Sequence, residues 1–185
     1  MSEFFDHITP AHADFIARQP VFFVATAAPD ARINLSPKGM DTFRVLGGGR
    51  ECAYLDYGGS GNETHAHLAA DGRICVMFCA FDQPALIYRI YGRGSAVLPQ
   101  DAGWAELAPQ FVIERGVRQI FRIAVESTQT SCGWAVPKMQ VTEERQTLRK
   151  YYVNDDSATR LLKYQERDRS IDGLPTTSPA FLPYD

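Results

Sequence analysis

Residues 73–98, RICVMFCAFDQPALIYRIYGRGSAVL, decide the fold because they hold two long runs of strand-forming residues. The runs Arg73–Phe81 and Leu86–Leu98 are rich in β-branched and aromatic side chains, which favour strands. Neither run alternates cleanly between apolar and polar residues, as a strand with one solvated side would. We therefore predict strands buried on both faces, as in a small barrel covered by helices or by a second subunit.

Shorter runs of similar composition stand on either side of these two. Val21–Ala27 ends at the turn signal Ala28-Pro29-Asp30, and Arg32–Ser36 then resumes as a strand, which predicts a hairpin. The further strand-like runs are Thr42–Leu46, Glu51–Tyr57 and Arg118–Thr128, of which the first two flank three glycines. The pattern predicts a mainly β protein, a β-barrel with peripheral helices.

The helical patterns are short and lie between or after the strands. Thr9 is predicted to cap a helix that begins at Pro10 and ends near Pro20. Ser60 and Glu63 have the spacing of a capping box, in which each side chain satisfies a backbone donor of the other at a helix start. The other predicted helical stretches are Thr64–Ala70, Asp101–Phe111 and the chain from Thr142 onward, with Thr142 and Ser157 as N-caps around a break at 154–156.

Length and charge exclude several classes of protein. A chain of 185 residues suits a single domain, which we expect over residues 1–185. The net charge of −3 gives no positive field that would hold a nucleic acid, so we expect no nucleic-acid partner, and a single-strand-binding barrel is disfavoured. No apolar run is long enough to cross a membrane, and Met1–Pro10 lacks the pattern of a secretory signal. We expect no membrane partner and a cytoplasmic location.

The cysteines and histidines indicate no metal site. The four cysteines include no C-x-x-C pair, and we interpret all of them, Cys132 included, as structural. His65 and His67 would diverge on a helix, and no third ligand is evident on a strand. We interpret these two histidines as solvated.

Two segments carry the residues of a phosphate pocket. Arg32–Gly39 (RINLSPKG) brings a hydroxyl, a cation and a flexible glycine to one sheet edge. Asp56–His65 (DYGGSGNETH) is a glycine-rich turn that leads into a helix, whose first amides and positive dipole end favour an anion. A phosphomonoester carries about −1.5 to −2 charges at neutral pH, which this set of donors matches.

In chain order, these segments resemble the pyridoxamine 5′-phosphate oxidase-related family of FMN-binding split β-barrels. The resemblance covers a split-barrel core over residues 20–139 and leaves 140–185 as a C-terminal helical extension. It rests on SPKG (36–39), GSGNET (59–64) and SCGW (131–134), taken in that order. The resemblance implies a homodimer that binds FMN at the subunit interface, with contributions from both chains.

The resemblance also implies which residues face the cofactor. The predicted cofactor-binding residues are Asn34, Ser36, Lys38, Ser60, Asn62, Thr64 and Trp134, the last reaching across from the partner subunit. Ser60, Asn62 and Thr64 would surround the phosphate, where the family commonly has basic residues. This departure shifts the positive charge to Lys38 and to Arg32, Arg89 or Arg93, a choice among three that the sequence leaves open. No catalytic acid or base is assigned.

The implied activity is that of an FMN-dependent oxidoreductase acting on an unidentified small molecule. Lys38 or an arginine would stabilise the negative charge of reduced flavin. True pyridoxamine phosphate oxidases have an Arg-x-His element after the tryptophan, whereas Trp134 is followed here by Ala135–Met139 (AVPKM), so oxidation of vitamin B6 is doubtful. The alternative is a non-catalytic carrier or sensor that binds FMN, a deazaflavin or haem. Haem is disfavoured because none of the histidines, at positions 7, 12, 65 and 67, lies in the late segment.

Overall fold

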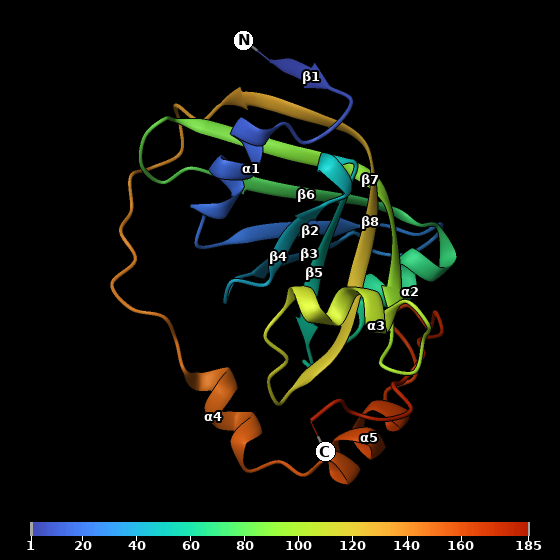
Figure 1. Ribbon diagram of the computed structural model, residues 1–185. Helices are drawn as coiled ribbons and strands as arrows, with labels where there is room; N and C mark the ends of the chain where they lie inside the picture. Colours follow the sequence, from blue (N-terminus) through green and yellow to red (C-terminus); the bar gives the residue numbers. More distant parts are fainter. Residues whose placement is uncertain (1, 185) are drawn as a thin grey trace.

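The computed structural model describes residues 2–184 and contains a curled antiparallel sheet. The strands are β1 (Glu3–Phe5), β2 (Phe22–Thr26), β3 (Asn34–Lys38), β4 (Phe43–Leu46), β5 (Glu51–Tyr57), β6 (Arg73–Cys79), β7 (Leu86–Val97) and β8 (Val117–Cys132). They lie in the order β3-β2-β6-β7-β8-β5-β4, and β1 pairs with β8. Figure 1 shows how this sheet curls into a half-barrel with helices at its ends. The prediction of a mainly β barrel with peripheral helices is confirmed.

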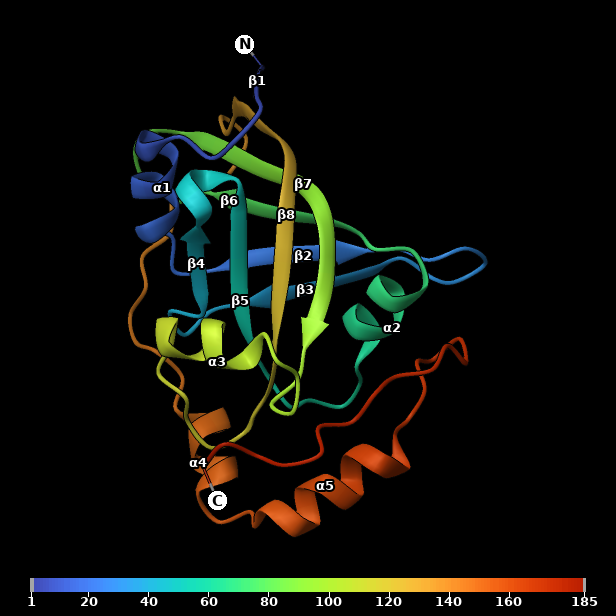
Figure 2. The ribbon, with the colours of Figure 1, turned by 45° about the vertical axis from the view of Figure 1, so that its right-hand side comes forward.

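The helices lie around the half-barrel. They are α1 (Pro10–Ala17), α2 (Glu63–Ala70), α3 (Trp104–Leu107), α4 (Thr147–Val153) and α5 (Ser157–Glu166), with single 3-10 turns at Gly47–Gly49 and Ala108–Gln110. In both Figure 1 and Figure 2, α5 lies at the same end of the barrel as α2. The last stretch of the chain contacts α2 directly, because the backbone N–H of Ile171 donates to the Glu63 carboxylate. None of the helices within residues 2–184 is both long and apolar enough to span a membrane.

The core lies on the concave side of the sheet and follows the strand register. Val24, Val76 and Ile90 are directly opposite one another on β2, β6 and β7, and all three are wholly buried. The alternate residues, such as Cys75 and Met77, point to the other side and are only half-buried. The long apolar runs therefore supply a core on one face and, in the single chain, leave a partly exposed apolar surface on the other.

Predicted helix boundaries are correct where the cap is local. Thr9 caps α1 by accepting a hydrogen bond from the His12 amide. The capping box is wrong, because Asn62 occupies the N-cap position of α2 and the Glu63 carboxylate binds the distant Ile171 amide instead. The prediction of Thr142 as an N-cap is wrong, because α4 begins at Thr147. The prediction of Ser157 is wrong by one residue, because Asp156 caps α5 by accepting a hydrogen bond from the Thr159 amide.

Phe78 lies at the centre of the aromatic core. It is 1% exposed and its ring contacts those of Phe22 and Phe43. We expect Phe78→Ala to lower the free energy of unfolding by about 3–5 kcal/mol, because it removes buried apolar contacts and leaves a cavity. Urea denaturation measures this, with Phe4→Ala, at a residue that is 67% exposed, as the matched control that should change stability by less than about 0.5 kcal/mol. Equal losses in the two variants would contradict this description of the core.

Candidate functional site

The polar face of β3 forms one wall of the site. Strand alternation puts Asn34, Ser36 and Lys38 on one side of β3, half-buried, while Leu35 points to the other side and is exposed. The β2–β3 register pairs Ser36 with the core residue Val24, so the polar face is turned toward the concave side of the sheet. Asn34 is held there by hydrogen bonds from its side-chain amide to the hydroxyls of Thr26 and Thr64.

The turn between β5 and α2 forms the opposite wall. The amide of Gly58 donates to the carbonyl of Gly116, which fixes the start of the turn against the strand that follows. A cavity of about 320 Å³ lies between this turn and β3. Its lining residues are Asn34, Ser36, Lys38, Asp56, Tyr57, Gly59, Ser60, Gly61, Asn62, Glu63, Thr64, Arg118 and Phe121. The two segments that the sequence indicated are thus brought together.

A buried carboxylate holds two cations at the floor of this cavity. Asp56 is 2% exposed and accepts hydrogen bonds from Lys38 Nζ at 2.9 Å and Arg118 Nη2 at 2.8 Å. Burial alone would raise the pKa of Asp56, but the charges and hydrogen bonds of Lys38 and Arg118, with a further hydrogen bond from Gln119, hold it well below its usual range. Asp56 is therefore ionised at neutral pH, and the three side chains together carry one net positive charge.

His65 connects this cluster to the end of the chain. Its Nε2 accepts a hydrogen bond from the Thr177 amide, so the ring proton is assigned to Nδ1, which donates to Gln119 Oε1 at 2.8 Å. The Gln119 side-chain amide donates in turn to Asp56 and Asn62. Burial lowers the pKa of His65, which keeps the ring neutral.

The interpretation of His65 and His67 as solvated is wrong. Both rings are buried, and His67 Nδ1 lies 3.1 Å from the Thr26 hydroxyl. Neither belongs to a metal cluster, because residues 2–184 contain no group of three His, Cys, Asp or Glu side chains placed to bind an ion.

Six of the seven predicted cofactor-binding residues line the cavity. Trp134 does not, and its side chain is 86% exposed in the single chain. The three candidate arginines also lie elsewhere: Arg32 pairs with Asp172, Arg89 donates to Ser131, and Arg93 pairs with Glu126. The arginine that does line the cavity is Arg118.

Asp56 and Arg118 are the site residues that sequence reasoning missed. Each is a charged residue within a mainly apolar stretch, in ECAYLDY (51–57) and in VRQIF (117–121). Because a buried charge is stabilised by a partner of opposite sign, that pattern was the available signal. The sequence alone did not show that the two strands are neighbours. The structure does, because Asp56 on β5 is paired with Gln119 on β8.

The donors present fit a phosphate monoester. Ser60 and Thr64 supply hydroxyls, the turn supplies backbone amides, and Lys38 supplies a cation that the cavity exposes. The Cβ that Gly59 lacks would meet nothing within 4 Å, so the turn leaves open space beside its backbone. A cavity of about 320 Å³ is also within the range of roughly 300–1,000 Å³ of small-molecule sites.

A half-barrel sheet whose polar edge faces a glycine-rich turn defines the chain as a split-β-barrel protein. The comparisons with known proteins make the assignment specific. The sequence model of the family described as "Pyridoxamine 5′-phosphate oxidase" matches residues 8–132 of this chain. The chain belongs to the pyridoxamine 5′-phosphate oxidase family.

A relative of similar sequence agrees with this assignment. The pyridoxamine 5′-phosphate oxidase family protein ustO of Aspergillus flavus is 34% identical over 194 residues, which cover 95% of this chain and 78% of the relative. A crystal structure of a HupZ variant from Group A Streptococcus has a TM-score of 0.52 at 20% identity, covering 67% of this chain and 99% of that one. It supports the fold alone. The FAD binding protein of Mycobacterium smegmatis is a weaker likeness, with a TM-score of 0.49, 11% identity, and coverage of 70% and 98%.

The Asp56 cluster makes the stability of the protein depend on pH. We expect Asp56→Asn to lower the free energy of unfolding by about 3–5 kcal/mol at pH 7, because Lys38 and Arg118 lose their buried counter-charge. The folded-state pKa of Asp56 is depressed, so this contribution is complete above the unfolded value of about 3.9 and is lost as the pH falls toward the folded value. Urea unfolding at pH 7 and pH 3 should therefore show wild type and variant converging in acid.

The matched control for this prediction is Asp41→Asn. Asp41 pairs with Arg44, but its side chain is 87% exposed, so its removal should cost less than about 1 kcal/mol. A difference between Asp56→Asn and wild type that stays constant from pH 7 to pH 3 would show that the carboxylate charge is not responsible.

Proposed function

We propose that this protein is an FMN-dependent oxidoreductase that acts on a small molecule in the cytoplasm. The observation that carries the proposal is the cavity between the polar face of β3 and the glycine-rich turn, with Lys38 reaching into it. In this proposal the turn and the hydroxyls of Ser60 and Thr64 hold the phosphate. Asn34 and Ser36 then lie along the ribityl chain and the ring.

The chain's own residues orient the cofactor and set the charge around it. FMN, when bound, supplies hydride transfer at its reactive ring nitrogen. Asp56 fixes the Lys38 ammonium at 2.9 Å on the cavity floor, so this positive charge is already in place before any charge develops in the site. Such a preorganised cation stabilises added negative charge without reorganisation of its surroundings. Phe121, wholly buried, closes the cavity on the core side.

The outer face of the sheet supports a homodimer as the working form. By register, the residues on this face alternate with the core residues, and those of β6 and β7 are half-buried in the single chain: Cys75, Met77, Ile87, Arg89 and Tyr91. Ile33, beside β3, is 79% exposed and Leu35 is 66% exposed. A second copy that covers this apolar surface would also shield Trp134 and could bring it to the partner's cavity.

The proposed substrate is a small molecule other than a vitamin B6 phosphate. Residues 135–139, which follow Trp134 directly, supply one cation, Lys138, and no Arg-x-His element occurs in the rest of the sequence. We therefore propose FMN as the cofactor and leave the identity of the small-molecule substrate open.

A second candidate function is that of a flavin carrier or sensor, with FMN, a deazaflavin or haem as cargo. One observation favours it. In the lining of the cavity, the pKa of Asp56 is lowered and the pKa of Tyr57 is raised, so both are shifted away from neutral pH. Neither of these two residues is thereby tuned as an acid or base near pH 7. Mass spectrometry of the small molecule that copurifies identifies the cargo.

The cofactor proposal is tested by titrating FMN and following the quenching of its fluorescence. We expect the wild type to bind FMN and Lys38→Ala to bind it about 10- to 100-fold more weakly, because a charge-assisted contact contributes about 1.5–3 kcal/mol. Lys150→Ala, on the exposed surface of α4, is the matched control and should not change the affinity. A wild type that binds no flavin, or Lys38→Ala with unchanged affinity and redox potential, would overturn the assignment.

Enzyme and carrier are distinguished by anaerobic reduction. The FMN-loaded protein is mixed with NADH, NADPH or pyridoxamine phosphate, and the flavin absorbance is followed. An oxidoreductase should lose its flavin colour with a nicotinamide, and pyridoxamine phosphate should have no effect. A flavin that neither nicotinamide reduces would favour the carrier, and bleaching by pyridoxamine phosphate would restore vitamin B6 oxidation.

A further inference from the structure

The carbonyls of the β5–α2 turn accept hydrogen bonds from α4, from the end of α5 and from β8. Tyr152 Oη of α4 donates to the Gly58 carbonyl at 2.6 Å. Arg167, at the end of α5, places Nη1 3.5 Å from the carbonyls of both Gly59 and Ser60. Arg118 of β8 donates to the Gly61 carbonyl at 3.0 Å. The carbonyls of Gly58, Gly59 and Ser60 are therefore directed toward α4 and α5, away from the cavity.

The amides of the same peptide groups must point the other way. A trans peptide is planar, and its C=O and N–H are antiparallel, so the orientation of each carbonyl fixes the orientation of the next residue's amide. The amides that follow these three carbonyls belong to Gly59, Ser60 and Gly61, and all three residues line the cavity. Within residues 2–184, these amides donate to no other group. A series of unpaired N–H groups on one side of a turn is a nest for an anion.

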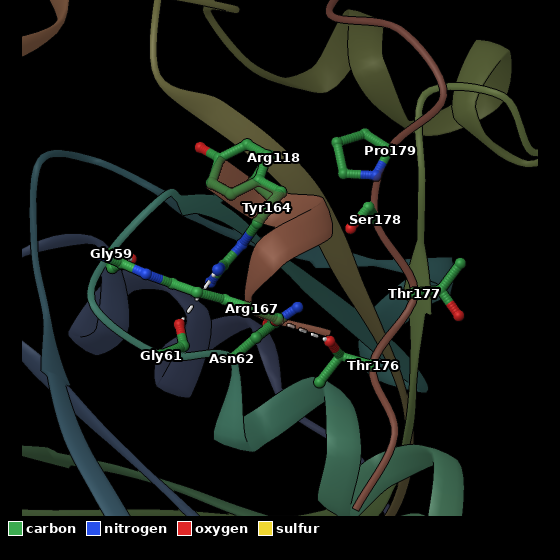
Figure 3. A pocket seen from close by; sticks show the side chains of 10 residues that line it. All are labelled: Gly59, Gly61, Asn62, Arg118, Tyr164, Arg167, Thr176, Thr177, Ser178 and Pro179. Atoms are coloured by element: carbon green, nitrogen blue, oxygen red, sulfur yellow. Dashed lines mark hydrogen bonds between the residues drawn. The ribbon is translucent and has the colours of Figure 1, made fainter. Parts of the chain in front are cut away.

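Direct packing confirms that α4 and α5 lie against this turn. A Cβ on Gly58 would lie 1.9 Å from Tyr164 Oη and 2.6 Å from Tyr152 Oη, so only glycine permits the approach. A Cβ on Gly116 would likewise lie 2.2 Å from the Tyr152 ring. The Arg118 guanidinium lies over the Tyr164 ring at 5.7 Å. Figure 3 shows Arg118 and Arg167 beside Gly59, Gly61 and Asn62, with Tyr164 next to them.

The small hollow behind the turn has no room for a ligand of its own. It is lined by Arg118, Arg167, Tyr164 and the tail at Thr176–Pro179, and its volume of about 10 Å³ is about that of one water. The two arginines therefore serve the turn rather than a second site.

We propose that the arm formed by α4 and α5 is a positioning device that makes the cavity selective for a ligand with a terminal phosphate. Tyr152 and Arg167 hold the turn's carbonyls, and the turn's amides consequently face the cavity as an anion cradle. They are positioning residues, since they act through the turn. The inference rests on the proposed function and deepens it, because it explains how the chain binds a phosphate without the basic residues common at this turn in the family.

The test compares two flavins that differ only in the phosphate. FMN and riboflavin are titrated into the full-length wild type, Tyr152→Phe and Arg167→Ala. We expect each variant to bind FMN about 5- to 10-fold more weakly and riboflavin with unchanged affinity, because each removes hydrogen bonding that orients the cradle. Arg169→Ala, which removes an exposed side chain bonded to the Gly173 carbonyl, is the matched control and should bind both flavins as the wild type does.

The outcomes separate this proposal from the function that it rests on. Equal losses for FMN and riboflavin would show a merely structural role, and no loss for either would show no role, so both results overturn the proposal. If the wild type binds neither flavin, the proposed function fails, and titration of inorganic phosphate decides about the arm. Weaker phosphate binding in both variants would support the arm's role, and unchanged phosphate binding would overturn it.

Discussion

The carboxylate of Asp56, buried between Lys38 and Arg118, is the interaction on which the site depends. It joins three strands that are distant in the sequence, since Lys38 lies on the edge strand β3 and Arg118 on β8. A buried charge tolerates little change in the position of its partners, because each displacement exposes an uncompensated charge to a low dielectric. The pairing therefore holds the edge strand β3 against β5 and β8, which lie toward the opposite edge of the sheet. The cavity occupies the space between them.

Hydrogen bonds extend the order of this cluster to the end of the chain. Gln119 and His65 connect Asp56 to the Thr177 amide, and both side chains have a defined donor and acceptor arrangement. The glycine-rich turn lies above this network and is held from behind by Tyr152 and Arg167. The scaffold is thus rigid below the cavity and behind the turn, whereas the cavity side of the turn keeps free donors. This arrangement suits the binding of an anion by neutral amides.

Local signals in the sequence were sufficient for most of the fold and failed where the partner is distant. Strand composition and the turn at residues 28–30 place the β2–β3 hairpin correctly, since both depend on neighbouring residues. The capping box at Ser60 fails because Glu63 finds a tertiary partner in the Ile171 amide. His65 and His67 look like surface residues of a short helix, yet the half-barrel and the tail bury them. Periodicity does not reveal which element will cover a helix.

The sequence by itself determined a mainly β barrel, its family, and the two segments that form the cavity. Residue types at short spacing carry that information, because strand alternation and turn chemistry act over a few residues. Only the tertiary structure decided which cations serve the site. In the structure Arg118 lines the cavity, and Arg32, Arg89 and Arg93 do not. The orientation of a charged side chain depends on strand order and on the position of its counter-charge, which for Arg118 is Asp56. Both are properties of the assembled sheet and of no single segment.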